Sequence, residues 1–163
     1  MYLSKQKRTG FTLTELLVVI AIISVLSTIV LFNVNLARNK GKNARAVADV
    51  SQYLTGLALA RERAANNQYP GTTSWACLGG SGCIWPSTTF TTANNELVNN
   101  PLREVMPSLP TSTYTESGYG GYQYQRYNSG YRIRWFLYGK DRKCEIGEQT
   151  GGNDSITLCA YSR

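Results

Sequence analysis

Histidine is absent from the 163-residue chain, and this absence excludes the classes of enzyme whose catalysis depends on histidine. Without histidine, neither a Ser-His-Asp triad nor a Cys-His pair can be built. The glycine-rich stretch at residues 79–83 lacks the lysine and the following helix of a phosphate-binding loop. We therefore expect a protein that is not an enzyme and that carries no cofactor.

Charged residues are absent from residues 16–37, which are mostly apolar. A helix needs about 20 such residues to cross a bilayer. The run is too long for the apolar region of a typical signal peptide, and no A-x-A cleavage site closely follows it. We predict a transmembrane segment at residues 12–34.

Basic residues flank this apolar run, although the formal net charge of the whole chain is only +7. From residue 64 onward, basic and acidic residues nearly balance. The flanking basic residues are Lys5, Lys7 and Arg8 before the run and Arg38, Lys40, Lys42 and Arg45 after it. Such a distribution is typical of membrane topology more than of nucleic-acid binding.

Proline is absent from residues 11–69, which favours one long helix over residues 12–66. Asparagine and glycine weaken helix propensity at residues 33–41, so the helix is expected to loosen there. Beyond that point, apolar residues recur at Val47, Val50, Leu54 and Leu57. This spacing forms one apolar stripe, which must be covered by a globular partner.

Residues 67–163 form the predicted globular head. A polar loop is expected at residues 71–100, and a short helix at 96–109 interrupted at Pro101. Alternating residues around a turn at 128–130 predict an antiparallel hairpin. A third strand follows at 156–161, after a polar loop at 139–155. The expected fold class is α+β, with a long N-terminal helix, half in the membrane and half packed on a small antiparallel sheet.

Four cysteines are present, and all of them lie in the head. An even number in a small exported domain indicates two disulfides, for which three pairings exist. We favour Cys77–Cys83 with Cys144–Cys159, so that the second bond holds the loop at 139–155. Zinc is the competing interpretation, but the spacing is not that of a zinc knuckle.

A basic leader ends in Gly10, and the sequence Phe11-Thr12-Leu13-Thr14-Glu15 opens the apolar run. This pattern resembles the type IV pilin and pseudopilin family over residues 5–32. The resemblance implies that residues 1–10 are a leader that a prepilin peptidase removes after Gly10. It also implies that Phe11 becomes an N-methylated terminus and that Glu15 faces the Phe11 amine of a neighbouring subunit. A carboxylate in an apolar environment is tolerated only when it is paired, which supports this role for Glu15.

The resemblance implies a structural subunit of a type IV pilus-like filament for motility, adhesion or DNA uptake. Its partners would be identical or related subunits, the prepilin peptidase and N-methyltransferase, and an inner-membrane assembly platform. The chain would be a single-pass precursor in the cytoplasmic membrane and later part of an extracellular pilus. The alternatives are a type II secretion pseudopilin and a signal-anchored binding module that does not polymerise.

Two features separate this sequence from parts of the family. Many pilus-forming pilins carry a proline within the apolar segment, and this chain has none there. Many pilins have a cysteine-bonded C-terminal loop, which major secretion pseudopilins generally lack. The pair Cys144 and Cys159 therefore favours a pilus subunit.

The sequence of the head contains two further candidate ligand sites. A DNA or ligand surface would combine aromatic and basic side chains, namely Arg126, Arg132, Arg134, Tyr124 and Tyr127. We favour instead that the aromatic residues form cross-strand pairs in a small sheet. A calcium site would use acidic residues of one loop, namely Asp141, Glu145, Glu148 and Asp154. We favour a solvated loop without a metal.

Overall fold

The computed structural model describes residues 10–80, 82–112, 114–116, 118–140 and 142–163. The chain divides into two compact units, Met1–Arg38 and Asn39–Arg163. Helix α1, Leu13–Arg63, contributes residues to both units. Lys5, Lys7 and Arg8 of the leader lie outside the described residues.

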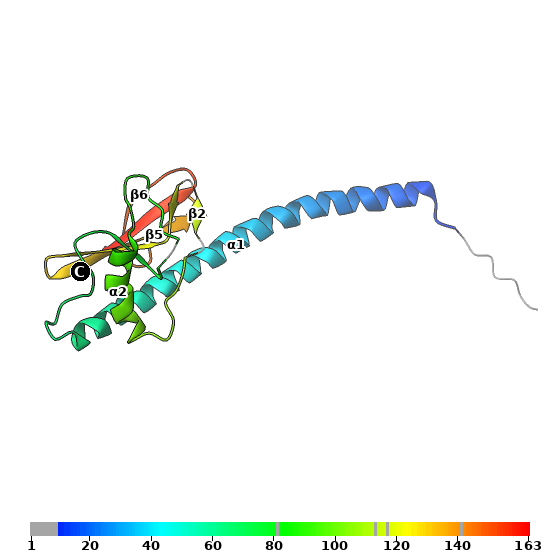
Figure 1. Ribbon diagram of the computed structural model, residues 1–163. Coiled ribbons are helices and arrows are strands. Elements are labelled where there is room, and N and C mark those ends of the chain that lie inside the picture. Colours follow the sequence, from blue (N-terminus) through cyan, green and yellow to red (C-terminus); the bar gives the residue numbers. More distant parts are fainter. Residues whose placement is uncertain (1–9, 81, 113, 117, 141) are drawn as a thin grey trace, which may run out of the picture. The chain divides into compact units, whose positions relative to one another are not determined.

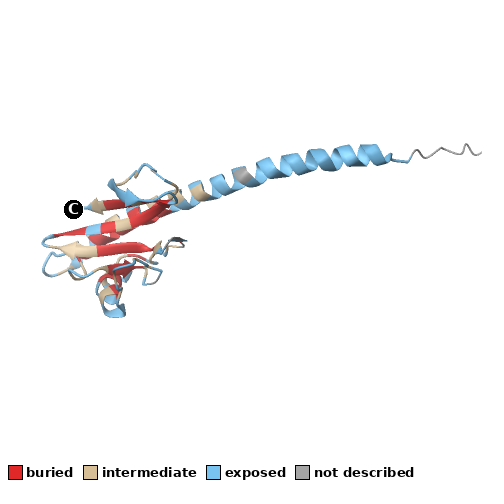
Figure 2. Cartoon of the chain, turned by 90° about the horizontal axis from the view of Figure 1, so that it is seen from above, coloured by how far each residue is buried: buried red, intermediate tan, exposed pale blue. Residues whose placement is uncertain are grey.

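The described part of the first unit is mainly the apolar part of α1, whose described side chains are exposed (Figure 2). By its length and composition, α1 qualifies as a membrane-crossing helix, a test that an N-terminal signal sequence also passes. The few hydroxyl groups of this part bond within the helix. Ser24 and Ser27 donate to the carbonyls of Ile20 and Ile23, both at 2.7 Å. Such internal bonds allow polar side chains to lie in an apolar environment.

Helix α1 continues through residues 33–41, where the sequence predicted a loosened segment. That prediction is wrong for the isolated chain. Each unfavourable residue costs no more than about 1 kcal/mol, and helix propagation from both flanks offsets such costs.

The second unit, which Figure 1 shows around the labels β5 and β6, is built on an antiparallel sheet of five strands. The strand order is β1-β4-β5-β7-β6. The strands are β1 (Ala76–Leu78), β4 (Tyr122–Tyr127), β5 (Gly130–Tyr138), β6 (Glu148–Gly152) and β7 (Ile156–Ser162). A separate small sheet pairs β2 (Thr115–Glu116) with β3 (Tyr119–Gly120). With the long helix, this sheet confirms the predicted α+β class.

The main core lies between one face of the five-stranded sheet and the second part of α1. Val50, Tyr53 and Leu57 of α1 are fully buried in one cluster with Ile133 and Trp135 of β5. The predicted stripe is therefore rotated, because Tyr53 lies at its centre while Val47 and Leu54 are only partly buried. Burial of these large side chains contributes about 1.5–3 kcal/mol each.

The opposite face of the sheet carries a smaller core of Tyr114, Phe136 and Ile156, against which Trp85 and Tyr119 pack. Alternation along β5 places Ile133 and Trp135 on one face and Arg134 and Phe136 on the other. Because both faces carry aromatic side chains, the tyrosine-rich pattern of the sequence divides between two cores.

Three elements of the head differ from the sequence predictions. β1 lies within the predicted loop at 71–100, and β6 lies within the predicted loop at 139–155. Helix α2 covers Thr92–Arg103, so it begins earlier and ends earlier than predicted. Thr91 caps this helix, because its side chain accepts a hydrogen bond from the Asn94 amide. Pro101 lies in the last turn, where it does not interrupt the helix.

Candidate functional site

Glu15, one of the two predicted assembly residues, lies in the first turn of α1. Thr12 precedes the helix, and its backbone N–H donates to Glu15 Oε2 at 2.8 Å. The Thr12 hydroxyl donates to the same oxygen at 2.7 Å, and the Glu15 amide lies 3.3 Å from Thr12 Oγ1. This is a capping box, in which the residue before the helix and the third helical residue satisfy each other's polar groups. Glu15 therefore has partners within its own chain.

The cap was not predicted from the sequence, although its signal is present there. A threonine followed three residues later by a glutamate, just before an apolar run, is the pattern of a capping box. The negative charge of Glu15 also lies at the positive end of the helix dipole. The cap and the helix dipole thus offset part of the free-energy cost of this charge within the single chain.

Gly10 and Phe11 are both exposed, and 83% of the Phe11 surface is accessible. A Cβ placed on Gly10 would meet no described atom within 4 Å. The described part of the chain therefore gives no packing reason for a glycine at this position. A need for glycine here would come from another molecule that binds this stretch.

The structure pairs Cys77 with Cys83 and Cys144 with Cys159, which is the pairing favoured from the sequence. The first disulfide joins the end of the sheet at β1 to the segment before Trp85. The second joins the loop after β5 to β7, where Cys159 is fully buried. All four cysteines are therefore bonded, which leaves no thiolate for zinc.

The candidate DNA surface is not assembled as the sequence suggested. Tyr124 is fully buried, and its hydroxyl donates to the Pro70 carbonyl at 2.7 Å, so its inclusion was wrong. Arg126 donates to Gln68 Oε1 and to the Tyr69 carbonyl. Arg132 is exposed and lies 5.9 Å from the Tyr127 ring. Alternation along two strands could not show that Tyr124 faces the helix.

Arg134 lies between two tryptophan rings, 3.4 Å from the Trp75 centroid and 4.1 Å from the Trp85 centroid. Within the described structure, its buried Nε and Nη2 atoms have no hydrogen-bond partner. Burial, and then the nearby charge of Arg132, lowers the pKa of Arg134 to about 10. Both faces of its guanidinium are occupied, so Arg134 is a packing residue of the head.

The candidate calcium residues do not converge. Asp154 pairs with Lys140 at 2.9 Å on the surface, and Asp141 lies outside the described residues. Within the described ranges, no three acidic or cysteine side chains gather closely enough to hold a metal ion. Calcium binding by Glu145 and Glu148 gains no support from this geometry.

The main core contains four buried tyrosines whose hydroxyl pKa values are shifted, namely Tyr53, Tyr122, Tyr124 and Tyr131. Burial is the largest cause that raises the pKa of each hydroxyl above its ordinary value. Tyr122 also donates to the buried Asp49 carboxylate at 2.7 Å, which raises its pKa further. These hydroxyls stay protonated in the folded head.

Comparisons with known proteins bear on the N-terminal region. The family described as "Prokaryotic N-terminal methylation motif" matches residues 5–31, which include Gly10, Phe11 and Glu15. Curated proteins and solved structures give no significant match. The motif does not distinguish a pilin from a pseudopilin. The chain therefore carries the N-terminal leader of a type IV pilin- or pseudopilin-type prepilin.

Proposed function

We propose that this chain is a structural subunit of a type IV pilus-like extracellular filament. A prepilin peptidase would cleave it after Gly10, and the mature chain would polymerise through α1. The methylation motif at residues 5–31, with Glu15 as the fifth residue from Phe11, is the observation that carries this proposal.

The chemistry of Glu15 supports assembly. In the single chain, its carboxylate accepts two hydrogen bonds from Thr12 but faces no cation among the described residues. The Phe11 amine of a neighbouring subunit would supply that cation and would stay positive after N-methylation. A pair of this kind favours one axial register between subunits, because a buried carboxylate without its partner costs about 3–5 kcal/mol.

The exposed apolar surface of α1 supports the same proposal. Its apolar side chains between Phe11 and Leu36 are more than a third exposed in the isolated chain, apart from Phe32, whose side chain is not described. Lipid would cover this surface in the precursor, and the helices of neighbouring subunits would cover it in a filament. The inner-membrane assembly platform would transfer the subunit from the first environment to the second.

A secretion pseudopilin is the second candidate. The Cys144–Cys159 disulfide, which holds the loop after β5, favours a pilus subunit. The absence of proline from residues 11–69 favours the pseudopilin, because many pilus-forming pilins have a proline in this segment. We place the pilus subunit first because major secretion pseudopilins generally lack a cysteine-bonded C-terminal loop of this kind.

Mass spectrometry of the mature chain tests the processing step. We expect a chain that begins with a methylated Phe11, and a chain that retains Met1 would contradict the proposal. Electron microscopy of material sheared from cells tests the assembly step. Long filaments that contain this chain support a pilus, whereas processing without any sheared filament would favour the pseudopilin.

A further inference from the structure

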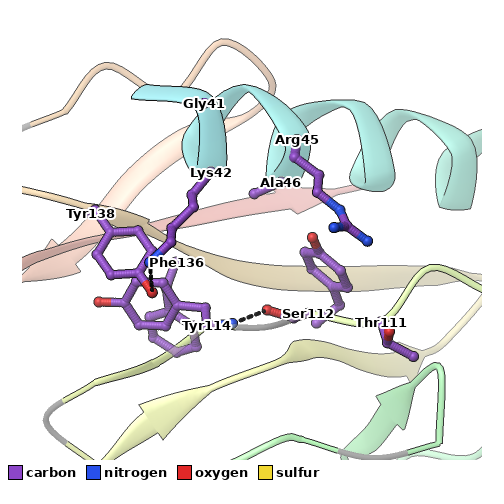
Figure 3. Close-up of a pocket in the computed structure, with 10 residues that line it drawn as sticks. Gly41, Lys42, Arg45, Ala46, Thr111, Ser112, Tyr114, Phe136 and Tyr138 are labelled. Atoms are coloured by element: carbon purple, nitrogen blue, oxygen red, sulfur yellow. Dashed lines mark hydrogen bonds between the residues drawn. The ribbon is translucent and has the colours of Figure 1, made fainter. Parts of the chain in front are cut away.

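A cavity of about 190 Å³ opens on the head between the second part of α1 and the chain that follows α2 (Figure 3). Lys42 and Arg45 reach into it from the helix, and Thr111 and Ser112 face it from the opposite side. Phe136 of β5 contributes an apolar wall. All of these residues belong to one compact unit of the chain.

The two cations lie on one face of α1, because residues three apart are neighbours on a helix surface. Lys42 Nζ lies 3.4 Å from the Tyr138 hydroxyl and 4.5 Å from the centre of the same ring. No residue that lines the cavity is acidic. The described surroundings of Lys42 therefore leave its charge without a carboxylate partner in the cavity.

Arg45 has one acidic neighbour, but the carboxylate of that neighbour already accepts a hydrogen bond from another residue. Arg45 Nε lies 3.7 Å from Asp49 Oδ2, and the same oxygen accepts a hydrogen bond from the Tyr122 hydroxyl at 2.7 Å. Asp49 is only 7% exposed, whereas the side chain of Arg45 is 63% exposed. Two cations and one buried carboxylate leave the cavity with one net positive charge.

Hydroxyl groups complete the polar lining. Ser112 Oγ accepts a hydrogen bond from the Tyr114 amide at 3.1 Å, which leaves the Ser112 hydroxyl hydrogen available to donate. Thr111 is exposed at the mouth of the cavity. An ammonium, a guanidinium and hydroxyl donors are the groups that bind a phosphate in proteins.

We propose that this cavity binds the phosphate group of an anionic lipid while the chain is still in the membrane. Lys42 follows the last residue of the charge-free stretch, Ala37, by five residues. Because α1 is helical here, this separation is about 7.5 Å along the helix. The headgroup layer on each side of a bilayer is about 5–7 Å thick, so a cation only five residues beyond the charge-free stretch is within reach of lipid phosphates. The lipid assignment rests on the proposed membrane insertion, whereas the phosphate site itself does not.

Native mass spectrometry of the full chain in neutral detergent micelles tests the proposal. The micelles are titrated with phosphatidylglycerol or with phosphatidylcholine, and the fraction of chain with bound lipid is measured. We expect saturable binding of phosphatidylglycerol and weaker binding of phosphatidylcholine. Lys42→Gln and Arg45→Gln should each weaken phosphatidylglycerol binding about tenfold, because each removes one charge-assisted contact.

Lys40→Gln is the matched control, because it removes the same charge from the same helix. Lys40 lies about 200° around the helix from Lys42 and lines a different depression, with Asn43 and Val47. We expect its affinity to stay within about twofold of the parent chain, as for an exposed charge outside the site. A tenfold loss in Lys40→Gln would show general attraction to basic surface and would overturn the site.

Thr111→Glu provides a second test that leaves both cations in place. This exposed substitution puts a carboxylate at the mouth of the cavity, so phosphatidylglycerol binding should be lost, while Thr111→Gln should retain it. Retained binding in Thr111→Glu would overturn the proposal. Circular dichroism of each variant checks that the head is folded.

A titration with sn-glycerol 3-phosphate separates the lipid from a soluble phosphate. Binding of glycerol phosphate that depends on Lys42 and Arg45, without preference for phosphatidylglycerol, would overturn the lipid assignment. Failure of the chain to insert into vesicles, with glycerol phosphate binding intact, would contradict the proposed function and leave the phosphate site standing. Equal binding of both lipids without glycerol phosphate binding would overturn the site.

Discussion

The structure shows one role for Glu15 at the start of α1, and the proposed filament would give it a second. Its carboxylate caps the helix through Thr12, and its charge is available to a cation on another chain. The cap requires only an acceptor at this position, since glutamine serves in a capping box as well as glutamate does. Assembly through an ion pair requires the charge itself.

Two substitutions distinguish these roles. Glu15→Gln keeps the cap and removes the charge, so we expect filament assembly to fall roughly 100-fold, the equivalent of about 3 kcal/mol per subunit contact. Thr12→Val keeps the charge and weakens the cap by about 1 kcal/mol, so filaments should still form. The measurement is the amount of sheared filament relative to total subunit in the membrane. Loss of filaments in Thr12→Val with filaments retained in Glu15→Gln would mean that the cap, and not the charge, is what assembly requires.

Asp49 is a buried acidic residue of α1 whose carboxylate accepts a hydrogen bond from the Tyr122 hydroxyl. Asp49→Ala should lower the free energy of unfolding by about 1–3 kcal/mol, because the buried hydroxyl is left without its acceptor. Urea unfolding of the full chain in neutral detergent measures this change.

The double variant Asp49→Ala with Tyr122→Phe provides the comparison. It removes both partners, so it should be at least as stable as Asp49→Ala alone. A double variant that is less stable than Asp49→Ala would show that the hydroxyl contributes through contacts other than Asp49.

At the scale of the elements, α2 holds the edge strand β1 through two buried amides. Asn95 Oδ1 accepts the Cys77 N–H at 2.7 Å, and Asn99 accepts the Gly79 N–H and donates to the Cys77 carbonyl. These side chains satisfy the backbone of β1 beside the helix. The short strand therefore depends on a helix that follows it in sequence.

Asn99→Ala tests this dependence. We expect a loss of about 1–3 kcal/mol in the free energy of unfolding, because the Gly79 N–H loses its Asn99 acceptor and the Cys77 carbonyl loses its Asn99 donor. Asn100→Ala is the matched control on the exposed side of the same helix, where Asn100 accepts a bond from Arg103. Its effect should stay within about 0.5 kcal/mol. Urea unfolding measures both, and similar losses would contradict a specific role for Asn99.

At the scale of the whole molecule, the buried tyrosines make the stability of the head sensitive to alkali. Their pKa values are raised on folding, so the stabilisation is fully present below pH about 10 and is lost as the pH rises further. Each such tyrosine lowers the free energy of unfolding by about 1.4 kcal/mol per pH unit in that range. Arg134, whose pKa of about 10 is lowered on folding, acts in the opposite direction.

Tyr124→Phe measures this contribution. Above pH 10, the variant should lose stability less steeply than the parent chain, by about 1.4 kcal/mol per pH unit. Tyr124→Phe with Tyr131→Phe should double that difference. Urea unfolding between about pH 9 and pH 11 gives the slopes, with the change at lower pH as the baseline. Parallel slopes in all three chains would show that these hydroxyls ionise in the folded head.

Sequence patterns predicted the head best where one strand alternated strongly. β4 and β5 are joined at Asn128, whose positive φ of 47° suits the tight turn that was expected there. β6 was missed because its residues, from Glu148 to Gly152, are all exposed and so show no alternation. β1 was missed because three residues are too few to show a period.

The candidate sites also differ in whether a local sequence pattern predicts them. A sequence motif identifies Gly10, Phe11 and Glu15, because all of its residues are contiguous along the chain. The basic cavity joins Lys42 and Arg45 to Ser112 across more than sixty residues, and no local pattern predicts it. Tyr124 looked available in sequence because alternation assigns a residue to one of two faces but does not say what covers that face.

The sequence by itself determined the leader, the long apolar helix, the hairpin and the α+β class. Each of these depends on local terms, namely side-chain charge, helical or strand period, and turn chemistry, which act over a few residues. Only the tertiary structure decided that Tyr124 is buried, that Arg134 lies between Trp75 and Trp85, and that two helical cations meet the hydroxyls of a distant loop. These outcomes depend on packing between segments far apart in the chain, where burial and desolvation set the energies.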